Sequence, residues 1–260
     1  MGKFRVGVVG PFSGPRSLQG ALLANVLQAS VYAKYFDFSY KDDQSNAKAA
    51  ALVALELVDS NVQGVIGHFN SISAEVAIRI YPTRIPIILP ASTAPHLSKH
   101  PNVYRSCPTD LQQAQLIMHA VEELPHRDCY VWSDQSSYAQ SIYAQLADYN
   151  SRPLDLGQKL SDQDLVIFLG SHQNIAEAIR ALKYEGIISA VCCDDCASDD
   201  FKTLTAGLPN IRKYLIQSSP SIADCVSSAA HTLYMLLSAA HNSTLIPKEN
   251  HAAKFTLLQL

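Results

Sequence analysis

Short apolar runs alternate with amphipathic stretches along most of this chain. A short apolar run between turn residues is typical of a buried strand, and the intervening stretches repeat their apolar residues at helical spacing. This alternation predicts an α/β fold with mainly parallel sheets covered by helices. The expected strands are 4–9, 36–40, 64–66, 85–89, 128–132, 165–169, 190–193 and 213–216, and the expected helices are 18–35, 46–58, 73–81, 111–124, 138–149, 174–184 and 222–240.

A break near residues 103–110 divides these elements into two lobes. A short extended piece there leads into a new helix, with Thr109 or Asp110 as its N-cap. A length of 260 residues with 48% apolar side chains is enough for two lobes, each with its own core. We expect an N-terminal lobe of residues 1–104, to which 219–243 return, a C-terminal lobe of 105–218, and a C-terminal segment of 244–260.

Composition excludes several classes of partner. Lys plus Arg number 20 and Asp plus Glu 23, with no basic run that would follow a phosphate backbone, so we expect no nucleic acid partner. No uncharged apolar stretch reaches about 18 residues, so no direct membrane insertion is expected. The six cysteines are far fewer than in a disulfide scaffold, which favours a reducing compartment.

Motifs for catalysis and metal binding are also missing from this sequence. It has no Gly-x-Ser-x-Gly elbow, complete dinucleotide fingerprint or Walker loop, so we do not expect an enzyme. The group Cys192, Cys193 and Cys196 suggests a metal, but a structural zinc site usually brings a second Cys or His pair. We therefore expect no metal and no cofactor, and interpret these cysteines as small buried apolar groups.

Two loops with small hydroxyl side chains follow consecutive expected strands. Ser71 follows strand 64–66, and Ser92 and Thr93 follow strand 85–89. Ligands of open α/β sheets bind outside the carboxyl ends of the strands, so these loops are expected to meet at one small polar molecule. The alternative is that the hydroxyls only cap helices, a position that Ser and Thr favour for its own sake.

The order and spacing of several short motifs resemble the type I periplasmic binding proteins of the leucine/isoleucine/valine-binding kind. The resemblance extends from Lys3 to about Ala206 and implies two Rossmann-like lobes that close on a small ligand. The chain resembles a compacted member, because the loop before Phe36 and the stretch after Gly207 are short. The motifs are Gly10 to Pro15 with Gly20, Asp42-Asp43 with Ala47, Val65 to His68, Pro90 to Thr93, and Tyr104-Arg105 with Pro108, Asp110 and Gln113.

The resemblance also implies roles for individual residues. Ser71 and Thr93 resemble the hydroxyls that receive an amino acid carboxylate, and the Ser92 carbonyl would accept from the ammonium. Tyr138 resembles the aromatic residue that closes over the ligand, and Asp195 the acid that pairs with the ammonium. On the residues alone, Tyr138 fits a packing role equally well, and Asp195 fits a solvated turn.

Other residues depart from the family pattern. Gln19 stands where the family often has a large aromatic, Asn70 and His172 add polar groups, and Phe69 adds bulk. Against an aliphatic ligand such polar groups would stay unpaired, at about 1 to 3 kcal/mol each when buried. We therefore expect these residues to bind a ligand with a polar side chain or an amide.

These features lead to three functional hypotheses. The first is the substrate-binding component of an ABC-type amino acid importer, with the importer's membrane subunits as partners. The alternative is a cytosolic ligand-sensing regulator of the same fold, with a regulatory partner protein. The third is a binding lobe kept for assembly without a ligand. We expect a periplasmic location if a leader was trimmed, and a cytoplasmic one if Met1 is the natural start.

Overall fold

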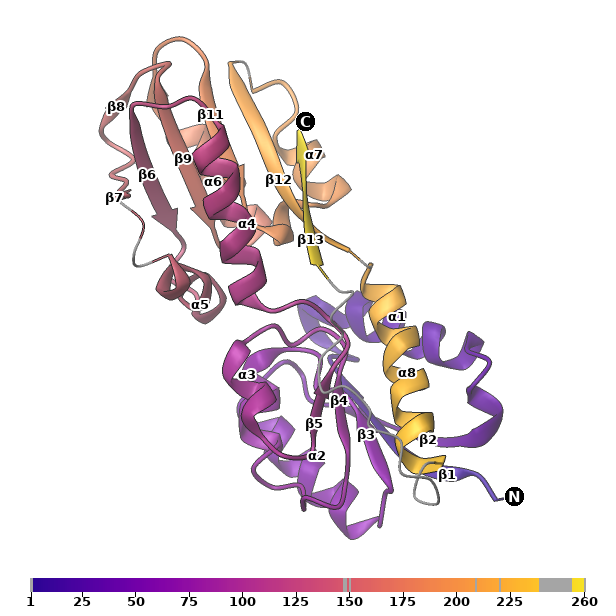
Figure 1. Ribbon diagram of the computed structural model, residues 1–260. Helices are drawn as coiled ribbons and strands as arrows, with labels where there is room; N and C mark the ends of the chain where they lie inside the picture. The colour runs from indigo at the N-terminus through magenta and orange to yellow at the C-terminus, as the bar shows by residue number, and fades with distance from the viewer. Residues whose placement is uncertain are drawn as a thin grey trace. The chain divides into compact units, whose positions relative to one another are not determined.

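The computed structural model describes residues 2–146, 149, 151–208, 210–219, 221–238 and 254–259. The chain divides into two compact units, Met1–Thr109 with Pro220–Ala253, and Asp110–Ser219 with Lys254–Leu260. Each unit contains a mainly parallel sheet covered by helices (Figure 1), which confirms the expected α/β fold class.

The first unit is built on a five-stranded sheet in the order β2-β1-β3-β4-β5. Every neighbouring pair in it is parallel. All carboxyl ends therefore lie at one edge of the sheet, and so do the loops that follow them. The strands are β1 (Phe4–Gly10), β2 (Phe36–Asp42), β3 (Gly64–Ile66), β4 (Ile87–Leu89) and β5 (Val103–Arg105).

Helices cover both faces of the first sheet because side chains alternate along each strand. Val8 of β1 belongs to one apolar cluster with Leu23 and Val226, while the next residue, Val9, belongs to a second cluster with Ala50. Figure 1 accordingly shows α1 and α8 on one side and α2 and α3 on the other. The helical elements are η1 (Gly14–Arg16), α1 (Ser17–Ala29), η2 (Ala33–Tyr35), α2 (Ala47–Asp59), α3 (Ser71–Ala77), η3 (Pro95–Lys99) and α8 (Ile222–Ser238).

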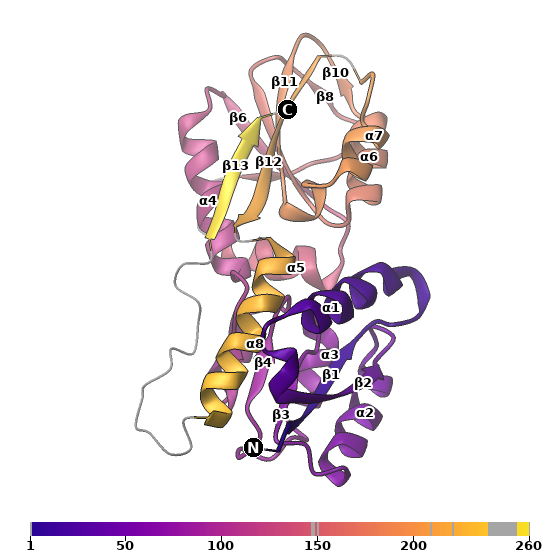
Figure 2. The same ribbon diagram turned by 90° about the vertical axis from the view of Figure 1, so that its right-hand side faces the viewer.

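The second unit is built on a six-stranded sheet in the order β13-β12-β11-β9-β6-β7. Only β13 is antiparallel to its neighbour. Figure 2 shows α4 on one side of this sheet, and α6 and α7 on the other. The strands are β6 (Asp128–Ser133), β7 (Arg152–Pro153), β9 (Asp164–Leu169), β11 (Ile188–Cys192), β12 (Ile211–Ser219) and β13 (Lys254–Gln259), with β8 (Lys159–Leu160) and β10 (Lys183–Tyr184) paired separately.

The helical elements of the second unit mostly begin at a capping hydroxyl. Ser136, Ser171 and Ser198 each accept a hydrogen bond from the backbone N–H three residues further on, which satisfies one of the otherwise free N–H groups at a helix start. The elements are α4 (Asp110–Glu123), α5 (Ser137–Gln145), α6 (His172–Ala181), η4 (Asp194–Cys196) and α7 (Asp199–Leu204).

Several element boundaries differ from those expected from sequence, and three of the differences change how the chain is divided. The expected helix 18–35 ends at Ala29, because the backbone of Ser30 is extended and a separate turn, η2, follows. Residues 105–109 belong to the first unit, since Arg105 is the last residue of β5. Residues 254–259 form β13 and pair with β12. Within the expected segments 219–243 and 244–260, residues 220, 239–253 and 260 lie outside the described residues. They include the end of the expected helix 222–240.

Gly20 provides a test of the packing of α1. A Cβ at this buried position would lie 2.3 Å from the Pro11 carbonyl oxygen, which is backbone and has little room to move. We predict that Gly20→Ala lowers the free energy of unfolding by about 1 to 3 kcal/mol through overpacking, although Ala is normally the better helix former. Urea unfolding measures the change. Gly2→Ala is the control, because a Cβ there meets nothing within 4 Å. An equal or higher midpoint for Gly20→Ala would contradict the packing described.

Candidate functional site

The loops after β3 and β4 are in direct contact. The backbone N–H of Ala94 donates to Ser71 Oγ at 3.2 Å, which brings the Ser71 and Thr93 loops together at the carboxyl edge of the first sheet. Asn70 caps α3, where its Oδ1 accepts from the Ser73 backbone N–H at 3.0 Å. The Asn70 Nδ2 group is buried and has no acceptor among the described residues. Thr93 is half-buried beside them.

A buried histidine, His68, contacts the second of these loops. His68 lies two residues after the end of β3, and its Nδ1 lies 2.8 Å from Asp43 Oδ2 and its Nε2 3.3 Å from the Tyr81 hydroxyl. Burial raises the pKa of Tyr81, and the charge of Asp43 adds to the effect, so the phenol stays protonated and donates. We therefore assign the His68 Nδ1 proton to the bond with Asp43. Its carbonyl oxygen accepts from Ser92 Oγ at 2.9 Å.

Arg105 holds the second loop from the other side. Its side chain is buried, and its guanidinium donates to the carbonyl oxygens of Ser92 and, at 2.8 Å, of Ala94. Nε donates to Ser98 Oγ at 3.1 Å. The Ser92 carbonyl, which we expected to accept from a ligand ammonium, accepts from Arg105 in the structure. Ser92 is a fully buried residue that supports the loop.

Two further residues of the expected site have different surroundings. Phe69 is only 4% exposed and belongs to the apolar cluster between the sheet and α1, so it is a core residue rather than added bulk beside a ligand. Gln19 is half-buried near the start of α1.

In the second unit, Tyr138 points to an acid, and that acid is Asp194. The Tyr138 hydroxyl donates to Asp194 Oδ1, and the Gln113 amide donates to the same oxygen at 3.1 Å. The pKa of Asp194 is raised to about 6. Burial is the main cause, the charges of Asp195 and Asp110 add to it, and the hydrogen bonds from Tyr138 and Gln113 oppose it. Burial and the charge of Asp194 also raise the pKa of Tyr138.

Asp195, the acid we expected at this place, has another partner. Its carboxylate accepts from the backbone N–H of His172 at 2.8 Å and lies 2.9 Å from His172 Nδ1. His172 Nε2 lies 2.8 Å from Asp200 Oδ2. The sequence shows two consecutive aspartates in a turn, and only the structure decides that Asp194 faces Tyr138 while Asp195 faces His172. From the sequence, we assigned no role to Asp194 or to Gln113. Gln113 is part of the motif that carries the family resemblance, and this was the signal that could have identified it.

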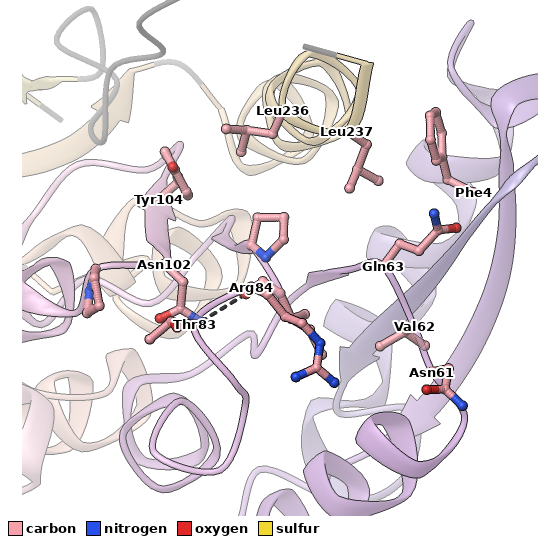
Figure 3. Close-up of a pocket in the computed structure, with 13 residues that line it drawn as sticks. Phe4, Asn61, Val62, Gln63, Thr83, Arg84, Asn102, Tyr104, Leu236 and Leu237 are labelled. Carbon is pink, nitrogen blue, oxygen red and sulfur yellow. Dashed lines mark hydrogen bonds between the residues drawn. The ribbon is translucent and has the colours of Figure 1, made fainter. Parts of the chain in front are cut away.

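The cavity of about 550 Å³ found in the first unit lies elsewhere (Figure 3). Most of its lining residues precede β3, β4 and β5, at the amino ends of these strands, and the end of α8 completes it with Leu236 and Leu237. None of the ligand residues expected from sequence lines it. The lining residues are Phe4, Asn61, Val62, Gln63, Thr83, Arg84, Ile85, Pro86, Pro101, Asn102, Tyr104, Leu236 and Leu237.

The described part of the chain contains no group of three or more His, Cys, Asp or Glu side chains able to hold a metal ion. All six cysteines are free thiols and buried. Within the same residues, no helix combines the length and hydropathy needed to cross a bilayer.

The fold and the strand-end loops define a two-unit α/β binding protein, and comparison with known proteins identifies the family. Residues 3–152 match the family model described as periplasmic binding protein, and the chain belongs to this family. It is 27% identical over 201 residues to a protein of Pseudomonas aeruginosa named amino acid binding protein, which covers 68% of this chain and 54% of the relative. The chain therefore spans about half the length of that curated relative.

Solved structures share the fold at low sequence identity. The substrate-binding protein LivJ of Streptococcus pneumoniae, in complex with isoleucine, has a TM-score of 0.70 and 18% identity and covers 93% of this chain and 85% of its own. LivK of Thermotoga maritima, a leucine-binding protein, has a TM-score of 0.70 and 16% identity, and the match covers 91% of this chain and 83% of LivK. A solute-binding protein of Rhodopseudomonas palustris in complex with 4-hydroxybenzoate has 0.67 and 14%, covering 92% and 81%. These likenesses confirm the type I periplasmic binding protein fold.

Arg105 allows a test of the loop support. We predict that Arg105→Met lowers the free energy of unfolding by about 2 to 4 kcal/mol, because the two buried carbonyl groups lose their donors. The control is Arg79→Met, which removes an exposed arginine paired with Glu75, and should change stability by less than about 0.5 kcal/mol. Urea unfolding measures both, and equal effects for the two variants would refute the assigned role.

The raised pKa of Asp194 predicts a pH dependence of stability. A carboxyl whose pKa is higher in the folded state binds its proton more tightly there, so it favours folding at low pH and loses that contribution as the pH rises to about 6. Relative to the parent, Asp194→Asn should therefore gain stability between pH 4 and 7. Urea unfolding at each pH measures the difference, with the exposed Asp162→Asn as control. A difference that does not change with pH would contradict burial of an ionisable Asp194.

Proposed function

We propose that this chain binds a small amino acid or amide-like ligand as the substrate-binding component of an ABC-type amino acid importer, and that it is not an enzyme. Membership of the periplasmic binding protein family and the name of the Pseudomonas relative support this function. The observation that carries it is the contact between the Ser71 and Thr93 loops at the carboxyl edge of the first sheet.

We assign the ligand carboxylate to these two loops. Ser71 Oγ accepts from Ala94, so its own O–H proton is left for a ligand oxygen. Thr93 supplies a second hydroxyl, and Asn70 Nδ2 is a donor that lacks an acceptor within the part of the chain that the structure describes. A buried donor without a partner costs about 1 to 3 kcal/mol, and a bound carboxylate would remove that cost.

We assign the ligand ammonium to Asp194 and Tyr138 in the second unit, in place of Asp195. Both charges of a bound zwitterion need a partner once water leaves, because otherwise desolvation exceeds the binding energy by several kcal/mol. The Asp194 carboxylate would meet this need for the ammonium, as the Ser71 and Thr93 hydroxyls would for the carboxylate.

Polar groups around the ligand side chain set the expected ligand class. Gln19, on α1, is a half-buried amide that an aliphatic side chain would leave unpaired. An amino acid with an amide or another polar side chain is therefore the preferred ligand. With Phe69 in the core and Asn70 assigned to the ligand carboxylate, Gln19 is the residue that we assign to this preference.

A cytosolic sensor of the same fold is the second candidate. All six cysteines are free and buried, which fits a reducing compartment. Fractionation of the native cells separates the two candidates, because an importer component would be recovered from the periplasm and a sensor from the cytosol.

A thermal-shift screen of the purified chain tests the ligand class. The panel contains amino acids, small amides and 4-hydroxybenzoate. A ligand at a hundredfold excess over Kd adds about 2.7 kcal/mol, a shift of a few degrees for a chain of this size. We expect an amino acid or amide to raise Tm, and 4-hydroxybenzoate, which has no ammonium for Asp194, to have a smaller effect.

Variants at each end of the ligand complete this test. Ser71→Ala and Thr93→Val should weaken binding of every carboxylate in the panel, whereas Asp194→Asn should weaken only the amino acids. Thr83→Val, at the opposite edge of the first sheet, and the exposed Asp162→Asn are the matched controls. The proposal fails if no compound shifts Tm, or if the site variants bind as well as the controls.

A further inference from the structure

His172 lies between two carboxylates. Its Nδ1 is 2.9 Å from Asp195 Oδ2 and its Nε2 is 2.8 Å from Asp200 Oδ2. An ionised carboxylate only accepts hydrogen bonds, so a proton on each ring nitrogen satisfies both contacts. The geometry therefore fits an imidazolium, and in this form His172 makes two charge-assisted hydrogen bonds.

These contacts connect three separate elements of the second unit. His172 begins α6, Asp195 lies in η4, and Asp200 lies in the first turn of α7. The backbone N–H of His172 donates to the same oxygen of Asp195 at 2.8 Å, so the Asp195 carboxylate is held by two donors of one residue. The turn that contains Asp195 also contains Asp194, the adjacent residue in the chain.

The two aspartates face different partners, and this sets the orientation of the turn. Asp194 accepts from Tyr138 and Gln113, while Asp195 is bound by His172. A turn of three residues has little freedom to rotate once both carboxylates are held. Release of Asp195 would remove one of its two side-chain attachments and allow Asp194 to move.

We propose that His172 is a positioning residue for the ligand site: its charged form holds Asp195 so that Asp194 stays directed at Tyr138, and ligand affinity falls when His172 loses its proton. The inference rests on the proposed function, since it assigns the ligand ammonium to Asp194. It replaces the direct ligand contact that the sequence suggested for His172.

The charged groups around His172 support this assignment. Burial lowers its pKa, but the hydrogen bonds and charges of Asp195 and Asp200 outweigh burial and raise the pKa above the usual 6.5. The other nearby groups already have partners. Asp199 pairs with Lys202 at 2.8 Å, Asp194 binds Tyr138, and Asp134 accepts from the Ser171 N–H and Asn174; Glu177 and Arg180 are the remaining charges on α6 itself.

The pH dependence of binding then has two limbs. Asp194 must be ionised to pair with an ammonium, and its pKa is about 6, so affinity rises as the pH passes 6. His172 must be charged to hold the turn, and its pKa lies above 6.5, so affinity falls again as the pH rises through that pKa. A neutral imidazole donates from one nitrogen only, and its other nitrogen then faces a carboxylate lone pair.

The first experiment needs no ligand. We expect NMR titration of the full chain to show that the backbone amides of Asp194 and Asp195 shift at the pKa of the His172 ring, above 6.5. His172→Gln should abolish this step, and Asp200→Asn should lower the ring pKa. His119→Gln is the matched control, because His119 is another histidine of this unit and pairs with an acid, Glu123. The inference is overturned if the amide of Asp194 does not respond to the His172 titration.

The second experiment measures affinity against pH, with L-glutamine as the probe. We expect a bell-shaped profile for the parent, a loss of about fivefold to tenfold at pH 7 for His172→Gln, and no alkaline limb for His172→Arg, which keeps its charge. An unchanged alkaline limb in both variants overturns the inference and leaves the proposed function standing. Absence of binding by any amino acid refutes the proposed function, and the ligand-free titration still decides whether His172 positions the turn.

Discussion

The strand-end loops of the first unit depend on one buried cation. Arg105 is only 3% exposed, and its guanidinium donates to the carbonyl oxygens of Ser92 and Ala94. The backbone N–H of Ala94 in turn donates to Ser71 Oγ, which joins the loop after β4 to the loop after β3. A guanidinium suits this position because it offers several donors in a fixed plane and keeps its charge. Removal of these donors would leave backbone acceptors buried without partners and release the loops that we assign to a ligand carboxylate.

The second unit positions its acid in a different way. Among the described residues no cation pairs with Asp194; a phenol and an amide donate to it, and its pKa is raised to about 6, chiefly by burial. The neighbouring Asp195 is instead held by a histidine. The first unit therefore offers hydroxyls in loops held by Arg105, which is always charged. The second unit offers an acid in a turn held by His172, which can lose its charge. In our proposal, the pH sensitivity of binding arises in the second unit alone.

Much of the fold followed from the sequence, because apolar periodicity reports which side chains are buried. The expected strands 4–9, 36–40 and 165–169 each fall within the strands β1, β2 and β9. The site was harder to predict. The contact between the Ser71 and Thr93 loops could be predicted, because both loops follow strands of one parallel sheet. The surroundings of Phe69, Ser92 and Asp195 could not be predicted, because they depend on which distant residues pack beside them. Phe69 packs in the core, the Ser92 carbonyl accepts a hydrogen bond from Arg105, and the Asp195 carboxylate contacts the His172 ring.

The sequence by itself determined the α/β class, the order of the elements and the placement of hydroxyl loops at strand ends, because these depend on the local spacing of apolar and polar residues. Only the tertiary structure decided which of two adjacent aspartates faces Tyr138 and which carbonyl groups Arg105 binds. Those choices depend on contacts between residues far apart in the chain, such as Gln113 with Asp194 and Arg105 with Ser92. Local periodicity carries no information about such pairs, because a hydrogen bond is set by the position of both partners in space.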